Sequence, residues 1–297
     1  MTTLRDLSLE YKGRIAPEDF TVLSAFVLGK TKEFVFREPD HVLSSEQDAT
    51  LRPILDRRTG HEPVAYILGE REFFGLPFFV TKDTLIPRPE TEHLVEEALE
   101  SLSRHSEKTA VIDIGTGSGA IIISVAHKLF TDRPEDIRHE FTAIDLFLSA
   151  LTVAKRNATR HDVLGHITFL EGNLLSPITE IISDDTGRIL ILANLPYLSQ
   201  TLYESAPADV RLHEPFSALV ADDEGLSLYT EVLDDIMRRK QDGWKNTPID
   251  GFFEISPEQE SSLERIFIDR FPTSEHSFLP DLSGRTRVFL FHIRYRE

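Results

Sequence analysis

The chain has 297 residues, of which 40% are hydrophobic, so a buried core and two unequal domains are expected. It contains no cysteine, which excludes disulfides, cysteine-ligated zinc and thiol nucleophiles and favours a reducing compartment. The formal net charge is -18, and such a field opposes the phosphate contacts that give nucleic-acid binding much of its affinity. The acidity has two interpretations: solubility, or attraction of a basic protein partner.

Export, membrane insertion and metal binding find no support in the sequence. The first residues, MTTLRDLSLEYKG, contain no apolar stretch of signal-peptide length. No apolar run approaches the roughly 18 residues that a membrane span requires. The 11 histidines show no ligand spacing, so no metal is expected. We therefore expect a soluble cytoplasmic protein with no membrane contact.

The N-terminal part of the chain is predicted to be helical. Residues 16–28 and 46–58 carry apolar side chains at helical spacing, and Gly29 and Gly60 are expected to end these helices. The aromatic-rich segment 70–80, with a central Gly-Leu-Pro break, predicts a short hairpin. These patterns indicate a small helical domain at 1–68, a hairpin and linker at 69–89, and a larger domain at 90–297.

The larger domain begins with a helix and continues with strands and helices in alternation, which predicts βαβ units and a mainly parallel sheet. In chain order we expect a helix at 90–101, a strand at 110–114, a helix at 120–130, a strand at 140–144, a helix at 149–160, strands at 167–170 and 189–193, a helix at 226–239, a strand at 251–255, a helix at 257–269, and strands at 275–279 and 288–293. The last two have no helix between them and predict an antiparallel hairpin. Ligands bind such sheets at the carboxyl ends of the strands.

A glycine-rich motif, Asp113-Ile-Gly-Thr-Gly-Ser-Gly119, closes the first predicted strand. Its glycines permit a tight turn and a close ligand approach. Their G-x-G-x-G spacing differs from the G-x-G-x-x-G of dinucleotide sites, and Asp113 would repel a pyrophosphate. A carboxylate there suits the cationic sulfonium and ammonium groups of S-adenosylmethionine. Asp145 ends the second predicted strand, where it can accept both hydroxyls of a ribose.

A second motif, Asn194-Leu-Pro-Tyr197, follows the fourth predicted strand. An amide nitrogen is a poor nucleophile, because its lone pair is delocalised into the carbonyl. The Asn194 side-chain oxygen and the Leu195 carbonyl can accept its two N–H bonds and hold it for attack. Pro196 stiffens the turn, and the Tyr197 ring can pack on a planar target. The motif therefore predicts methylation of a planar amide or amino nitrogen, with no metal and no strong base.

The chain resembles the protein-(glutamine-N5) methyltransferases of the PrmC/HemK type, which modify class 1 peptide-chain release factors. Besides the two motifs, the resemblance rests on further segments along nearly the whole chain: Pro63-Val-Ala-Tyr-Ile-Leu-Gly69, Phe73-Phe-Gly75, Leu85-Ile-Pro-Arg-Pro-Glu-Thr-Glu92, Asp209-Val-Arg-Leu-His-Glu-Pro215, Gly225-Leu226, Asp281-Leu-Ser-Gly284 and Arg287-Val288. It implies the class I S-adenosylmethionine-dependent α/β fold, Rossmann-like, with seven strands and an N-terminal helical substrate-recognition domain.

The resemblance also implies an assignment of site residues. The expected cofactor-binding residues are Asp113, Gly115, Thr116, Gly117, Ser118, Gly119, Asp145, Asn173, Leu174 and Asn194. The expected catalytic residues are Asn194, Leu195, Pro196 and Tyr197, and Arg88 and Glu90 join these four as substrate-binding residues. The implied substrate is the glutamine of a Gly-Gly-Gln sequence in a release factor, and the enzyme is expected to act as a monomer.

The chain departs from the family pattern at several positions. Leu195 stands where proline is usual, which keeps the carbonyl but loses rigidity. Asn173 stands where aspartate is common, and Ser256 replaces a glycine. Residues 221–224 are Ala-Asp-Asp-Glu where a glycine-rich run is usual. These changes put the rate in question rather than the type of reaction.

Three other functions compete with this one. An N6-adenine nucleic-acid methyltransferase shares the clamp chemistry, but it would need a basic groove and base flipping. A catalytically silent cofactor-binding module finds its only support in Leu195. A dehydrogenase conflicts with the glycine spacing and with Asp113.

Overall fold

The structure is a computed structural model that describes residues 1–133, 138–178, 183, 185–281 and 283–294. It divides into two compact units, each described by itself below. One contains Met1–Glu70 and Ala206–Glu214, and the other contains Arg71–Ser205 and Pro215–Glu297. The segment 206–214, which we expected within the larger domain, thus belongs to the smaller unit.

The smaller unit is built from short helices around one apolar cluster. Its helices are α1 (Leu4–Glu10), α2 (Pro17–Leu28), α3 (Lys32–Arg37), α4 (Ser45–Thr59), α5 (Val64–Leu68) and α10 (Ala208–His213). The predicted helices at 16–28 and 46–58 are confirmed as α2 and α4, and Gly29 caps α2 in the left-handed conformation. The other four were not predicted, because helices of 5–7 residues are too short to show a period.

The larger unit contains a seven-stranded sheet in the order β5-β4-β3-β6-β7-β9-β8. Its strands are β3 (Thr109–Ile114), β4 (Glu140–Asp145), β5 (Ile167–Glu171), β6 (Arg188–Ala193), β7 (Ile249–Glu254), β8 (Glu275–Pro280) and β9 (Thr286–Ile293). The strands from β5 to β7 pair in parallel, whereas β9 pairs antiparallel with both β7 and β8. The predicted strands, the mainly parallel sheet and the terminal hairpin are therefore confirmed.

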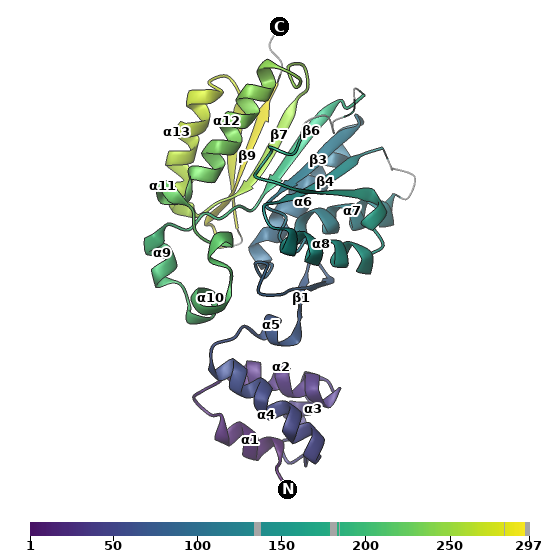
Figure 1. Cartoon of the computed structure of the whole chain (residues 1–297), viewed down its shortest axis with the longest axis vertical. Helices are drawn as coiled ribbons and strands as arrows, with labels where there is room; N and C mark the ends of the chain where they lie inside the picture. Colours follow the sequence, from purple (N-terminus) through teal and green to yellow (C-terminus); the bar gives the residue numbers. More distant parts are fainter. Residues whose placement is uncertain (134–137, 179–182, 184, 282, 295–297) are drawn as a thin grey trace. The chain divides into compact units, whose positions relative to one another are not determined.

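Helices cover both faces of this sheet (Figure 1). Helices α6 (Glu92–Arg104), α7 (Ala120–Asp132) and α8 (Leu148–Arg160) share one apolar cluster with Val111, Leu190 and Leu192. Helices α12 (Ser227–Gln241) and α13 (Glu260–Arg270) share the other cluster with the alternate strand residues, such as Ile112 and Ile191. Successive strand side chains point to opposite faces, so both faces of these fully buried strands are apolar.

The predicted hairpin forms from β1 (Glu70–Phe73) and β2 (Leu76–Phe79). Its turn lies at Phe74 and Gly75, which both have positive φ, at 51° and 71°. We had placed the break across Gly-Leu-Pro, but Leu76 and Pro77 already belong to the second strand. Two residues with positive φ match the tight hairpin turn whose twist suits the flanking strands.

Short elements complete the larger unit. They are η1 (Pro89–Thr91), η2 (Leu164–His166), α9 (Gln200–Ser205), η3 (Phe216–Ala218), α11 (Asp222–Gly225) and η4 (Pro257–Gln259). Elements η1 and η4 form the first turns of the helices predicted from residues 90 and 257, and the others were not predicted. Two of these short elements, η1 and η3, contribute residues to the site described below.

The register of the sheet brings the two sequence motifs to one edge. Ile114 of β3 lies opposite Ile144 of β4 and Ala193 of β6. The next residues along these strands are Gly115, Asp145 and Asn194, so all three lie at the same carboxyl edge. Ala193 in turn lies opposite Phe253 of β7, which places Glu254 at this level too.

Candidate active site

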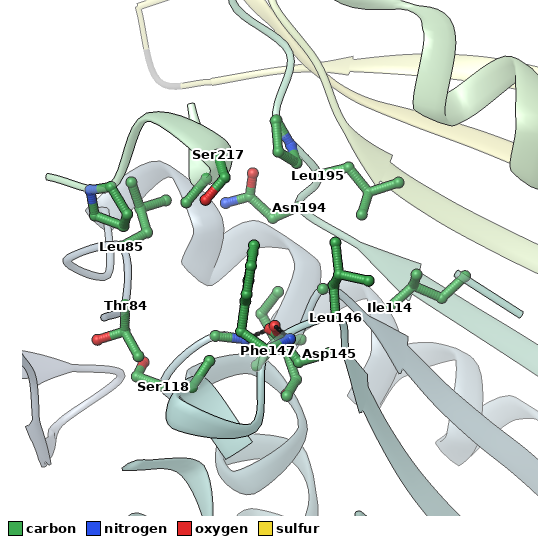
Figure 2. A pocket seen from close by; sticks show the side chains of 18 of the residues that line it. Thr84, Leu85, Ile114, Ser118, Asp145, Leu146, Phe147, Asn194, Leu195 and Ser217 are labelled. Atoms are coloured by element: carbon green, nitrogen blue, oxygen red, sulfur yellow. Dashed lines mark hydrogen bonds between the residues drawn. The ribbon is translucent and has the colours of Figure 1, made fainter. Parts of the chain in front are cut away.

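A pocket opens at this edge of the sheet, within the larger unit (Figure 2). Ten of the residues predicted from sequence line it: Gly115, Thr116, Gly117, Ser118, Asp145, Asn173, Leu174, Asn194, Leu195 and Pro196. Both motifs, about 80 residues apart in the chain, thus share one cavity. The cavity has a volume of about 180 Å³ and is partly open to solvent.

The glycine-rich turn forms one wall of the pocket and is fixed largely by its own backbone. Gly115, Gly117 and Gly119 all have positive φ, at 69°, 57° and 80°. Gly115 also lies against Leu195, since a Cβ at this glycine would stand 2.9 Å from the leucine Cδ2. The backbone N–H of Thr116 donates to the Ile144 carbonyl at 2.9 Å, which joins the turn to β4. Glycine is therefore needed at position 115 both for its positive φ and because a Cβ would collide with Leu195.

Asp113 does not line this pocket. Its side chain is fully buried, and its Oδ2 accepts a 2.6 Å hydrogen bond from the Thr116 hydroxyl. Burial raises the pKa of the Asp113 carboxyl to about 7, although the Thr116 hydroxyl opposes the shift. We expected a carboxylate exposed to a cationic ligand. The contacts instead assign Asp113 to support of the turn, because β3 is buried along its whole length.

Asp145 lines the pocket and orders the backbone at its rim. Its Oδ2 accepts the N–H of Gly117 at 2.8 Å, and its Oδ1 accepts the N–H of Phe147 at 3.0 Å. Burial raises the pKa of the Asp145 carboxyl, and these backbone donors oppose the shift. A carboxylate has about four acceptor positions, so each oxygen can take a further hydrogen bond.

Asn173 and Leu174 lie on the neighbouring wall, after β5. The Asn173 side-chain nitrogen donates to Glu231 at 3.0 Å, which leaves its Oδ1 as an acceptor. Because aspartate has no donor, it could not form this hydrogen bond with ionised Glu231. The asparagine therefore offers the pocket the same kind of atom as the aspartate usual in the family.

Asn194 is oriented by a residue of η1. Its Nδ2 donates to the Thr91 hydroxyl oxygen at 3.0 Å, and Thr91 is itself buried. Both residues line the pocket. With the nitrogen engaged, the Asn194 Oδ1 remains as an acceptor. Figure 2 shows this side chain among the residues that line the pocket.

Leu195 and Pro196 continue this wall. The Leu195 side chain is buried in the apolar cluster under α12, and its N–H donates to the Tyr229 hydroxyl at 3.2 Å. A proline at this position would have no N–H to donate. The departure from the family pattern thus introduces a hydrogen bond that the usual residue cannot make.

Tyr197, Gly119, Arg88 and Glu90 are the other expected site residues that do not line this pocket. The Tyr197 hydroxyl donates to Glu254 at 3.1 Å, and burial raises its pKa well above the usual value. Arg88 lowers the pKa of Tyr197, and Glu90 raises the pKa of the buried Glu254 carboxyl. Their contact with a substrate remains a prediction.

Several wall residues were not assigned from sequence. They are Asp83, Thr84, Leu85, Pro87, Thr91, Ile114, Ala120, Ile121, Leu146, Phe147, Ala150, Gly172, Pro215, Ser217, Ala218 and Leu228. Leu85, Pro87, Thr91 and Pro215 lie in segments that carry the family resemblance, which was a usable signal. Leu146 and Phe147 carry no such signal, since exposed apolar residues after a strand are common.

The lining suits S-adenosylmethionine. Asp145 and Asn173 offer acceptors for hydroxyl and amino groups, and the flat Phe147 ring with Leu146 and Leu174 offers apolar contacts for a purine. The described part of the chain contains no helix with the length and apolar character to cross a bilayer.

Comparison with known proteins identifies the family. The family model for the PrmC N-terminal domain matches residues 9–69. A release factor glutamine methyltransferase of Vibrio cholerae is 40% identical over 74% of this chain and 72% of its own length. Another, of Rhodopirellula baltica, is 32% identical over 93% of this chain and 90% of its own length.

Solved structures share the fold. The N-terminal domain of human METTL16 in complex with SAH has a TM-score of 0.51 at 17% identity and covers 97% of both chains. The METTL16 catalytic domain in complex with an RNA hairpin has a TM-score of 0.54, also at 17% identity, covering 92% of this chain and 91% of that one. Such likeness establishes the class I methyltransferase fold alone. The sequence relatives go further, and the chain belongs to the release factor glutamine methyltransferase family.

Proposed function

We propose that this protein transfers a methyl group from S-adenosylmethionine to the side-chain amide nitrogen of the glutamine in a Gly-Gly-Gln sequence of class 1 release factors. The observation that carries the proposal is the orientation of Asn194. Thr91 engages the only donor group of its side chain, and the acceptor oxygen remains at the pocket that the glycine-rich turn also lines. Membership of the family supplies the substrate class.

The cofactor side of the pocket is assigned to Asp145, Asn173 and the turn from Gly115 to Ser118. S-adenosylmethionine supplies an electrophilic methyl group. Asp145 would accept the ribose hydroxyls with the oxygens that already hold the backbone of Gly117 and Phe147. The Asn173 Oδ1 would accept an N–H of the adenine, since its nitrogen is engaged with Glu231.

The target side is assigned to Asn194 and Leu195. The Asn194 Oδ1 and the Leu195 carbonyl would each accept one N–H of the glutamine amide and place its nitrogen against the methyl group. Such positioning makes a bimolecular attack effectively unimolecular. Acceptors aimed at the nitrogen also stabilise the positive charge that develops there during transfer.

The partner and compartment follow from the same proposal. A release factor is a soluble protein of translation, so the enzyme is assigned to the cytoplasm. The net charge of -18 suits a partner with a basic surface and disfavours direct binding of nucleic acid. We expect the enzyme to act as a monomer, which light scattering of the purified protein would test.

The test incubates the protein with S-adenosylmethionine and an unmodified bacterial release factor, then maps methylation by peptide mass spectrometry. A single methyl on the glutamine of Gly-Gly-Gln is expected. A release factor in which this glutamine is replaced by alanine is the control and should remain unmodified. Methylation of DNA or RNA instead would favour the adenine methyltransferase, and cofactor binding without any transfer would favour the silent module.

The cofactor assignment has its own test. Asp145→Ala should weaken binding of S-adenosylmethionine by about 10-fold or more, because it removes acceptors for the ribose and the support of the Gly117 and Phe147 amides. Isothermal titration calorimetry measures the dissociation constant. An unaltered constant would refute the ribose assignment.

A further inference from the structure

One buried carboxylate lies beneath the whole Asn194–Tyr197 loop. Glu254 ends β7, and its side chain is only 2% exposed. Burial raises the pKa of this carboxyl, and the hydroxyls of Thr91 and Tyr197 oppose the shift. A carboxyl group placed in such surroundings costs stability unless its neighbours provide hydrogen bonds. The hydrogen bonds of Glu254 therefore indicate its role in the structure.

The first contact reaches the end of the loop. The Tyr197 hydroxyl donates to Glu254 Oε1 at 3.1 Å. The Tyr197 carbonyl is fixed independently, because Gln259 Nε2 donates to it at 2.9 Å. Glu254 thus holds the side chain of Tyr197, and Gln259 holds its backbone.

The second contact reaches the start of the loop. Asn194 Nδ2 donates to the Thr91 oxygen at 3.0 Å, and the Thr91 hydroxyl lies beside the Glu254 carboxyl, whose pKa it lowers. Glu254 Oε2 forms no direct hydrogen bond within the described residues, so Thr91 orients Asn194 without a hydrogen bond to that oxygen.

The third contact reaches the middle of the loop through the backbone. The Leu195 N–H donates to the Tyr229 hydroxyl at 3.2 Å, and that hydroxyl donates to the Glu254 backbone carbonyl. The Tyr229 ring is held in place by stacking on Phe253, with ring centroids 5.0 Å apart. This contact requires an N–H at position 195, which leucine provides and proline does not.

We propose that Glu254 is the positioning residue of the target site, and that it holds Leu195 and Tyr197 in the geometry for methyl transfer. The inference rests on the proposed function for the reaction that the loop performs. It assigns to Tyr229 the task of replacing, through a hydrogen bond to Leu195, the rigidity that a proline would give. Neither Glu254 nor Tyr229 lines the cofactor pocket, so both act through the loop.

The test compares Glu254→Gln with the wild-type enzyme. Glutamine keeps the size and one acceptor, but it carries no charge, so the hydrogen bond from the Tyr197 hydroxyl should weaken. We expect kcat for a release factor to fall roughly 10- to 100-fold, the loss typical of a hydrogen bond to a charged group. The dissociation constant for S-adenosylmethionine should change by less than about twofold, because the cofactor side is untouched.

The matched control is Asp250→Asn, at the other end of the same strand. Asp250 is as buried as Glu254, at 1% exposed, but it pairs with Arg188 and His292 away from the loop. The control should lower the melting temperature and leave kcat of the folded enzyme unchanged. A Glu254→Gln enzyme with wild-type kcat would overturn the proposal, as would parallel losses of kcat and cofactor affinity.

A second readout does not depend on activity. The Tyr197 ring signals, followed by NMR, should broaden in Glu254→Gln, and exchange of the Leu195 backbone amide should accelerate in Tyr229→Phe. Unchanged ring signals in the first variant and unchanged exchange in the second would overturn the network even if activity fell. If the wild-type enzyme methylates no release factor, the proposed function fails, and these NMR signals still decide whether Glu254 holds the loop.

Discussion

The two sides of the pocket are stabilised in different ways. The cofactor side, from Gly115 to Gly119, is formed by residues close in sequence, with three positive φ angles and a hydrogen bond from Thr116 to Asp113. The target side, from Asn194 to Tyr197, is held by side chains between 34 and 103 positions away. The first takes its shape mainly from its own backbone and is joined to β4 through Thr116 and Gly117, whereas the second depends on side chains from distant parts of the chain.

This difference separates the expected effects of mutation. Changes in the turn should affect folding stability and cofactor affinity, because the turn is both a structural corner and a binding surface. Changes in the target loop should affect turnover with little effect on cofactor binding, because the loop contributes to the transition state.

The largest effect is expected at Asn194. Asn194→Ala should lower kcat by roughly 100- to 1000-fold, since it removes an acceptor aimed at the reacting nitrogen. Asn173→Ala is the matched change on the cofactor side and should weaken S-adenosylmethionine binding while kcat at saturation is retained. Steady-state kinetics and calorimetry measure both. Wild-type turnover in Asn194→Ala would contradict the role of Asn194 as an acceptor for the target amide.

The next effect concerns Asp113 and depends on pH. Its pKa rises from 3.8 in the unfolded chain to about 7 in the fold, so the native state retains a proton that the unfolded state loses. Its contribution to stability is therefore full below about pH 4 and decreases as the pH rises toward 7. Asp113→Asn should lack this decrease and gain roughly 2–3 kcal/mol relative to wild type between pH 5 and pH 8.

Urea denaturation at the two pH values measures this difference. A mutant whose stability runs parallel to that of the wild type would show that Asp113 stays ionised in the fold. Each protein is compared with itself at the two pH values, so any fixed cost of placing an amide at this buried position cancels from the change in its unfolding free energy.

A smaller effect should distinguish two glycines of the same turn. A Cβ at Gly119 would stand 2.5 Å from Ile123 Cδ1 and 3.2 Å from Ala154 Cβ, whereas at Gly117 the nearest atom is 4.0 Å away. Gly117→Ala should cost about 1–2 kcal/mol for the positive φ alone. Gly119→Ala adds overpacking, for a total of roughly 2–4 kcal/mol. Equal losses in urea denaturation would contradict the packing argument.

The smallest effect is a gain in stability at Glu224. This residue has φ 54° and ψ 32°, and it stays in that conformation because Gln259 binds its carbonyl at 2.9 Å. Glu224→Gly should stabilise the fold by roughly 0.5–1 kcal/mol, since glycine adopts this conformation without a steric penalty. Asp222→Gly, outside the left-handed region, is the control and should bring no gain. Thermal unfolding would measure both.

Much of the fold could be predicted because the signals were local. Several strands of the sheet carry short apolar runs, such as Ile189–Ala193 in β6, and the long helices carry periodic apolar faces, so both are recognisable from local sequence. The helices of five to seven residues were missed for the converse reason. The assignment of segment 206–214 to the smaller unit could not be read locally, because it depends on packing between distant parts of the chain.

The site divides in the same way. The sequence by itself determined where the turn and the Asn194 motif lie, because glycines with positive φ and a polar residue after a strand are local patterns. Only the tertiary structure decided that Asp113 supports the turn from behind, that Thr91 orients Asn194, and that Glu254 and Tyr229 underlie the loop. Such contacts depend on strand register, which long-range packing sets and no short stretch of sequence encodes.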